Sequence, residues 1–219
     1  MTAALGGGLM LINNLGSLHA SRVDDASRGP AVFVSLVSAF NSGGRVLSGF
    51  ASDYLLYEHG VARPYLLAAA NAIFAVAMLG LTFGSGILPL YVACVVGGTA
   101  YGSVNILFPA LLSEIFGLAL FPILYTLISG VAFSLGSLIM STLVYGTNFD
   151  AALLRHGLEA TQPCRFADCY TPAVYTCATV SATSALLCLL FAYLTREDYA
   201  QYQRDSRSPM PTIAQMGLM

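Results

Sequence analysis

The chain has 219 residues, of which 57% are hydrophobic and only 9% are charged, and its formal net charge is −2 at pH 7. An ordinary soluble domain is about 25% charged, so this composition excludes a soluble enzyme, a disordered tail and a nucleic-acid-binding protein as leading interpretations. It indicates instead an all-α protein that crosses a lipid bilayer several times.

Charged residues fall into groups, and the uncharged stretches between them have membrane-spanning lengths. A spanning helix needs about 20 mostly apolar residues. One uncharged block is long enough for two crossings, and Gly84, Ser85 and Gly86 predict the turn between them. The sequence therefore predicts a bundle of six transmembrane helices within residues 1–195 and a polar tail at 196–219. The helices are expected over about 1–20, 31–55, 64–83, 87–112, 122–146 and 170–195. The arginines divide evenly between the two sides, so the positive-inside rule gives no orientation.

Asn13 and Asn14 are adjacent amides inside the first predicted helix, and Gly16 follows them. Amides in lipid need hydrogen-bond partners, and a nearby glycine permits local unwinding. Transporters use such interrupted helices at their binding sites. The residues alone leave open whether this pair contacts a ligand or another helix.

Arg45 is the charged residue inside the second predicted helix. It lies about 12 Å along the helix axis from Asp53, the nearest charged end. Inserting a guanidinium at such a depth costs at least about 2.5–3.5 kcal/mol. No acidic residue of the six helices is placed to neutralise it, although Asn41, one turn earlier, could form a hydrogen bond with it. Because arginine binds carboxylates in a bidentate manner, we expect a bound anion or a partner outside this chain. The alternative is an arginine whose head reaches the membrane interface.

Small residues are dense in the predicted helices. Gly98 and Gly102 form a G-x-x-x-G pair, and Gly43, Gly44 and Gly49 lie in the second helix. Small residues let helices approach closely in lipid, so close packing is the expected role of most of these glycines.

The sequence predicts no enzyme, no metal site and no cofactor. It contains no zinc-protease, nucleophile-elbow or nucleotide-binding motif. The histidines His19, His59 and His156 lie apart, at helix ends or in loops, without the spacing of metal ligands.

Several segments, in order along nearly the whole chain, resemble one family. Residues 41–53 read N-x-x-G-R-x-x-x-G-x-x-S-D, which resembles the eighth helix of major facilitator transporters of the nodulin-like group and of the related oxalate/formate antiporters. Residues 8–16 are similar to the seventh helix of that group, and residues 62–64 to the start of its ninth. Residues 113–117 are similar to its S-E-x-F-G turn after the tenth helix, and residues 164–170 to its C-x-x-x-x-C-Y loop before the twelfth.

This resemblance implies the C-terminal six-helix half of a twelve-helix major facilitator fold, in a plasma or organelle membrane. The expected partners are the lipid bilayer, a small-molecule substrate, and the missing N-terminal half or a second copy of the chain. The tail and the turn at Glu114 would be cytosolic. The loop with Cys164 and Cys169 would lie outside or in a lumen, where a disulfide between them is permitted; two free thiols are the alternative.

The resemblance also implies a cytosolic gate and a substrate cavity. The gate would involve Gly49, Asp53, Arg63 and Glu114. Family members carry an arginine after the aspartate, whereas Tyr54 follows Asp53 here, so the next basic residue is Arg63. The cavity would be lined by residues of the first, second, fourth and fifth helices, namely Arg45, Asn41, Asn13, Asn14, Tyr101, Asn105 and Tyr125.

The function that the resemblance implies is secondary active transport of a small solute by alternating access. A small organic anion is the expected class, with Arg45 binding its carboxylate. The alternative is a truncated, non-transporting membrane scaffold or regulator that pairs with a full-length relative.

Overall fold

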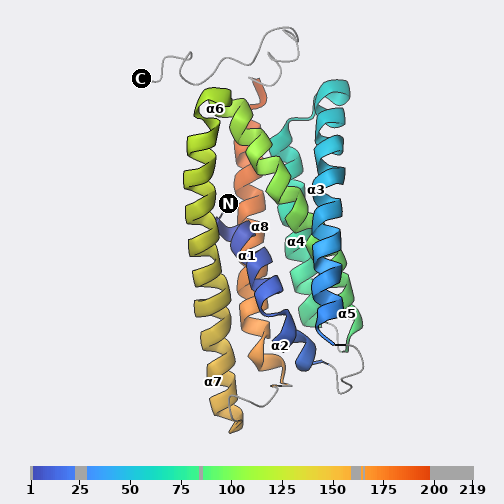
Figure 1. Cartoon of the computed structure of the whole chain (residues 1–219), viewed down its shortest axis with the longest axis vertical. Helices are drawn as coiled ribbons and strands as arrows, with labels where there is room; N and C mark the ends of the chain where they lie inside the picture. The colour runs from blue at the N-terminus through green and yellow to red at the C-terminus, as the bar shows by residue number, and fades with distance from the viewer. Residues whose placement is uncertain (1, 23–28, 84–85, 159–163, 165, 198–219) are drawn as a thin grey trace.

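The regular structure of the described chain is entirely helical (Figure 1). The computed structural model describes residues 2–22, 29–83, 86–158, 164 and 166–197. The all-α class predicted from composition is confirmed. Most of the predicted tail, and Gly84 and Ser85 of the predicted turn, lie outside the described residues. The α-helices are α1 (Thr2–Asn13), α2 (Leu15–Ala20), α3 (Ala31–His59), α4 (Arg63–Phe83), α5 (Leu88–Val92), α6 (Gly98–Gly136), α7 (Thr147–His156) and α8 (Thr171–Leu194), with π-helices η1 (Ala93–Gly97) and η2 (Ser137–Gly146) and a short 3-10 helix η3 (Ala167–Cys169).

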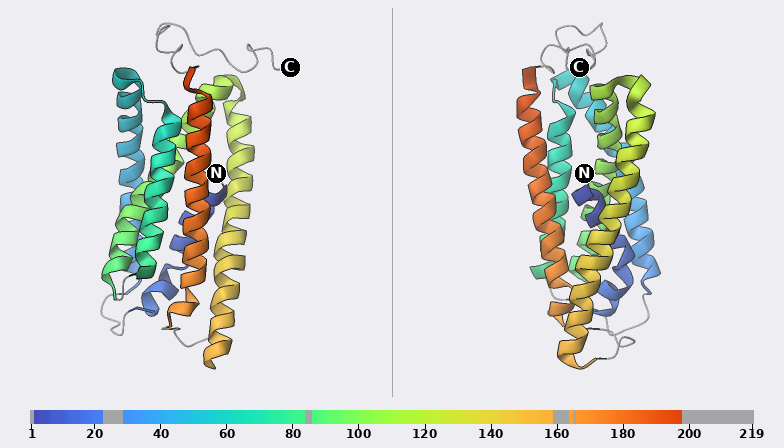
Figure 2. Two further views of the ribbon diagram at one scale, coloured as in Figure 1. Left: turned by 180° about the vertical axis from the view of Figure 1, so that it is seen from behind. Right: turned by 90° about the vertical axis from the view of Figure 1, so that its left-hand side faces the viewer.

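Four helical stretches of the described chain are long and apolar enough to cross a membrane, namely 31–59, 63–83, 88–156 and 171–194. The third has 69 residues, and it reverses direction at Gly117, as Figures 1 and 2 show. Gly117 has φ 73° and ψ 166°, a conformation essentially reserved for glycine. The helices expected at 87–112 and 122–146 are therefore the two arms of this hairpin.

The hairpin differs from the sequence expectation at two places. Residues 113–121 lay between the expected helices, with a turn expected at 113–117, but they are helical on both sides of Gly117. The second arm was expected to end near residue 146, but η2 and α7 extend it to His156. Polar residues such as Asn148 and Asp150 end an apolar span without ending a helix, so charge alone misplaced this boundary.

The first predicted helix is interrupted. α1 ends at Asn13, and Asn14 (φ −105°, ψ 12°) separates it from α2. Figure 1 shows that α1 begins at mid-height of the bundle and that α2 lies at the lower end. Most of the apolar side chains of these two helices belong to the main core and are almost completely buried; these are Leu5, Met10, Leu11, Leu15 and Leu18.

α1 packs on α6, η2 and α8. α3 packs on the first arm of α6, and α4 packs on α8 (Figure 2). At the lower end Arg22 follows α2, and its guanidinium donates hydrogen bonds to the backbone oxygens of Leu81 and Gly86 and lies over the ring of Tyr170. Burial lowers the pKa of Arg22, the interaction with Tyr170 partly opposing this. Arg22 thus ties three connections together at this end.

Candidate functional site

Arg45 lies at the centre of α3 and on an exposed face of the bundle. It is the middle residue of the 29-residue helix, and its side chain is exposed in the isolated chain. No ion pair or hydrogen bond joins it to another described residue. A charge at the depth of a spanning helix needs a counter-charge or water, so Arg45 is a candidate ligand-binding residue.

Two glycines determine how α3 meets the first arm of α6. A Cβ atom built on Gly102 would lie 2.1 Å from the backbone oxygen of Asn41 and 3.1 Å from the backbone nitrogen of Arg45. A Cβ on Gly44 would lie 2.3 Å from the backbone oxygen of Thr99. The two backbones are therefore in direct contact at the level of Arg45, as the G-x-x-x-G spacing predicts.

Tyr101 and Asn105 lie on α6 beside Arg45. The Tyr101 hydroxyl lies near the Asn105 side chain and interacts electrostatically with Arg45. Asn105 Nδ2 also donates to the backbone oxygen of Tyr101, at 2.9 Å. The hydrogen bond expected between Arg45 and Asn41 is not formed, and the buried Asn41 Oδ1 has no hydrogen-bond partner among the described residues. The α6 backbone packs against the backbone of Asn41. This packing explains why the Asn41 side chain does not form a hydrogen bond with Arg45, one turn later on α3.

Asn13 and Asn14 contact a different helix. Asn13 Nδ2 donates to Ser137 Oγ at 3.4 Å, and Asn14 Nδ2 donates to Ser141 Oγ at 2.9 Å. One turn later the hydroxyls of Ser17 and Tyr145 are 2.6 Å apart, in a hydrogen bond that either can donate. We call this set of three polar pairs between α1–α2 and η2 the polar ladder. It was not predicted from the sequence, although the four-residue spacing of Ser137, Ser141 and Tyr145 was the available signal.

Tyr125 lies on the second arm of the hairpin, above this ladder. Its ring stacks on Phe121 with centroids 5.4 Å apart, and its backbone oxygen accepts a hydrogen bond from Ser129. The seven residues expected to line one cavity thus separate into a group around Arg45, the polar ladder and Tyr125. No described contact joins Arg45 to the other two groups.

Three of the expected gating residues form one cluster near the C-terminal end of α3. Arg63 Nη2 donates to Asp53 Oδ1 at 2.7 Å, and Arg63 Nε lies 2.9 Å from Glu114 Oε1. The side chains of Arg63 and Glu114 are 12% and 17% exposed, whereas that of Asp53 is 57% exposed. Arg63 therefore joins α3 and α4 to the turn at Gly117. The fourth residue, Gly49, makes only ordinary contact distances, with Ile106 at 3.8 Å from its built Cβ.

Cys164 and Cys169 form a disulfide, with their Cα atoms 6.4 Å apart. Both side chains are buried, against Ala152 and Leu153 of α7. His156 stacks on Phe166 and lies 3.9 Å from Asp168. The disulfide therefore holds Cys164 and Cys169 against the side of the last turns of α7.

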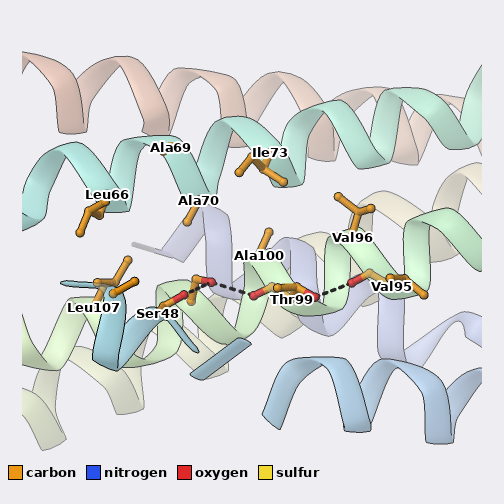
Figure 3. A pocket seen from close by; sticks show the side chains of 12 residues that line it. Ser48, Leu66, Ala69, Ala70, Ile73, Val95, Val96, Thr99, Ala100 and Leu107 are labelled. Atoms are coloured by element: carbon orange, nitrogen blue, oxygen red, sulfur yellow. Dashed lines mark hydrogen bonds between the residues drawn. The ribbon is translucent and has the colours of Figure 1, made fainter. Parts of the chain in front are cut away.

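A cavity of about 360 Å³ lies between α3, α4 and the first arm of α6 (Figure 3). Its walls are mostly alanine and branched aliphatic side chains. Its hydroxyls all donate hydrogen bonds within the protein. Ser48 donates to Ser103, Ser103 to the Thr99 backbone oxygen and the Thr99 hydroxyl to the Val95 backbone oxygen. The three hydroxyl protons of this cavity are therefore already donated within the protein, and its wall offers a ligand no free hydroxyl donor.

The described residues contain no cluster of His, Cys, Asp and Glu side chains that could hold a metal ion. Comparisons of the chain with known protein families, curated proteins and solved structures found no match. The site is therefore interpreted from its own residues.

Proposed function

We propose that this chain is one half of a secondary active transporter for a small organic anion. In this proposal the chain is the C-terminal six-helix half of a major facilitator transporter of the nodulin-like type. The second half, or a second copy of the chain, completes the cavity, and the two halves rock around a central site.

The observation that carries the proposal is the unneutralised Arg45 at the centre of a spanning helix. A guanidinium placed there is costly unless a counter-ion or water meets it. Tyr101 and Asn105 beside it supply neutral polar groups, which can orient a ligand without competing for its charge. A fork of N–H donors facing no protein carboxylate suits a carboxylate ligand.

The face that carries Arg45 also supports a two-part assembly. Val46 and Phe50 line an open groove together with Arg45 and are 58% and 76% exposed. In a bilayer, apolar side chains face lipid at little cost, but the guanidinium does not. A second bundle on this face would enclose the arginine and leave the ligand as its counter-ion.

The cluster of Asp53, Arg63 and Glu114 supports a gate at one end of this path. It connects the ends of two helices to the hairpin turn through one guanidinium. Ion pairs between packed elements can break and re-form when those elements move between two arrangements. We propose that they hold one end of the assembly in its closed state.

The test is uptake of radiolabelled oxalate and formate by proteoliposomes containing the full-length protein. Arg45→Ala is expected to lower uptake at least about a hundredfold, which corresponds to losing a charge-assisted bond of about 3 kcal/mol. Arg45→Lys should recover part of this loss, since it keeps the charge but not the fork. Leu47→Ala is the matched control, because Leu47 is exposed on α3 but lies on a different side of the helix from Arg45, so uptake should be unchanged.

Unchanged uptake in a correctly folded Arg45→Ala protein would contradict the role of the arginine. If the wild-type protein transports neither anion but binds a full-length relative, the scaffold alternative gains support. A monodisperse monomer of the chain in mild detergent would count against both partnered forms.

A further inference from the structure

The open groove beside Arg45 holds a second charged side chain. The groove has a volume of about 360 Å³. Five residues of α3 and one of α6 line it, namely Arg45, Val46, Gly49, Phe50, Asp53 and Ile106. We call it the Arg45 groove. Arg45 and Asp53 lie eight positions apart on α3, which is about 12 Å along the helix axis. A guanidinium and a carboxylate thus line one groove without contacting each other.

Asp53 can accept more hydrogen bonds than the one it receives from Arg63. Arg63 Nη2 donates to Asp53 Oδ1 at 2.7 Å, while Arg63 Nε lies 2.9 Å from Glu114 Oε1, so two carboxylates share this guanidinium. A carboxylate has acceptor sites for about four hydrogen bonds. Asp53 Oδ2 has no hydrogen-bond partner in the described part of the chain, and the Asp53 side chain is 57% exposed. The carboxylate therefore retains the capacity to bind a cation in the groove.

The lining between the two charges is apolar and open. Val46 and Phe50 are both exposed, and Ile106 of α6 completes the lining. Gly49 lies halfway between Arg45 and Asp53 in the sequence, and a Cβ built on it is 3.8 Å from Ile106 Cγ1. Because Gly49 has no side chain, the space between the charged residues stays free for a hydrocarbon chain.

We propose that the Arg45 groove binds a zwitterion, whose carboxylate pairs with Arg45 and whose ammonium pairs with Asp53. This inference rests on the proposed role of Arg45 as a carboxylate-binding residue, and it adds a positive charge at the other end of the ligand. A carboxylate in the same groove attracts such a charge and repels a second negative one.

The spacing of the two charged residues selects the length of this zwitterion. Ion pairs of about 2.8 Å at each end of a 12 Å span leave about 6 Å between the charged groups of the ligand. An α-amino acid is too short, because a single carbon separates its ammonium from its carboxylate. An unbranched ω-amino acid such as 6-aminohexanoate has the required length, and its methylene groups match the apolar lining at Val46 and Phe50.

The test is equilibrium binding of radiolabelled 6-aminohexanoate to the full chain, purified in mild detergent. Hexanoate and hexylammonium serve as competitors, since each has a similar hydrocarbon body and only one of the two charges. We expect 6-aminohexanoate to bind at least about tenfold more tightly than either compound, because each of them lacks one charge-assisted bond. Glycine should compete weakly, because its two charges are too close together to reach both residues.

Two variants show whether Asp53 binds the ammonium. Asp53→Asn should abolish the preference for 6-aminohexanoate over hexanoate while hexanoate still binds. Glu114→Gln is the matched control, because it changes the other carboxylate that meets Arg63 but does not alter the lining of the groove. We expect the ratio of the two affinities to change in the Asp53 variant alone. An equal change in both variants would overturn the proposal and assign Asp53 to the gate only.

The ratio of affinities in the wild-type chain decides the matter even where a variant fails to fold. Equal binding of hexanoate and 6-aminohexanoate would overturn the zwitterion proposal and leave Arg45 as a carboxylate-binding residue. Failure of every carboxylate to bind would overturn both proposals. Tight binding of 6-aminohexanoate without its uptake by proteoliposomes would support the groove as a zwitterion site and count against transport.

Discussion

Arg63 is the residue on which the charged end of the bundle depends. One guanidinium meets two carboxylates from different segments, but the two contacts differ in exposure. Glu114 is mostly shielded from solvent, whereas Asp53 is mostly exposed. Shielding strengthens an ion pair and also raises the cost of leaving one partner unpaired.

A double-mutant cycle should resolve this difference. We expect the Arg63–Asp53 coupling, measured with Arg63→Gln and Asp53→Asn, to fall within the range of about 0.2–1 kcal/mol seen for exposed pairs. The Arg63–Glu114 coupling, measured with Glu114→Gln, should be larger because that carboxylate is shielded. The measurement is the free energy of unfolding in detergent. Equal couplings, or a larger one at Asp53, would contradict the inferred role of Glu114.

Single residues were predictable from the sequence where charge and depth conflict. Arg45 stands out because a charge inside an apolar stretch is costly, whereas the trio of Asp53, Arg63 and Glu114 was expected at a gate because of the family resemblance. The trio was expected at the gate, and the structure brings it together. The separation of Asn13 and Asn14 from Arg45 was not predictable, since it depends on which helix face meets which neighbour. That information lies in the packing of three helices and not in any one of them.

At the scale of elements, the contact between α3 and α6 rests on backbone proximity. Gly44 and Gly102 each leave no room for a methyl group, while the neighbouring Gly43 has open space around its built Cβ. These adjacent glycines therefore allow a test in which the intrinsic helix propensity is the same and only the surroundings differ.

Alanine at these three positions should give opposite effects. Gly44→Ala and Gly102→Ala are expected to destabilise the protein by about 1–3 kcal/mol, the typical cost of overpacking. Gly43→Ala should be neutral or stabilising by up to about 1 kcal/mol, because alanine favours the helix. Thermal unfolding in detergent measures all three. A loss of stability at Gly43 as large as that at Gly44 would argue against direct contact of the two backbones.

The polar ladder joins α1 and α2 to the second arm of the hairpin. Tyr145→Phe removes one hydroxyl and leaves that of Ser17 without its partner. We expect a loss of about 0.6 kcal/mol, and at most about 1.7 kcal/mol, as is typical of hydrogen bonds between helices in membranes. Tyr175→Phe on α8 is the control, because its hydroxyl has no hydrogen-bond partner in the described part of the chain, and it should have no effect. A Tyr145→Phe protein as stable as the wild type would show that the ladder contributes nothing at this rung.

At the scale of the whole molecule, the spacing of charged residues predicted where the membrane-spanning helices lie but not at which residues they end. The bilayer sets the length of an apolar stretch, so the sequence located α3, α4 and α8 closely. It did not show that η2 and α7 extend the second arm, because helix and membrane span are different properties. Nor did it show that Gly117 alone forms the sharp turn of the hairpin, since a positive φ is one of several possible roles for glycine.

The two ends of the bundle carry different chemistry, and this yields a test of sidedness. The C-terminal end of α3 and the start of α4 lie at one end with the Arg63 cluster, while the end of α7 and the disulfide loop lie at the other (Figure 1). Disulfides persist on the oxidising side of a membrane. We therefore expect Glu58, which is exposed near the end of α3, to lie on the opposite side of the membrane from Cys164 and Cys169.

The measurement uses a membrane-impermeant maleimide and sealed vesicles of known orientation that contain the full-length protein. A Glu58→Cys protein should react only from the cytosolic side, without prior reduction. Cys164 and Cys169 are buried while they are bridged, so they should react only after an impermeant phosphine has reduced them and released the loop, and then only from the other side. Cys94 and Cys177 are buried and should stay silent, and a variant lacking both loop cysteines measures the reactivity of Cys188. Labelling of Glu58→Cys and the reduced loop from the same side would be incompatible with α3 and α7 ending on opposite faces of one bilayer, and the transport proposal would lose its geometry.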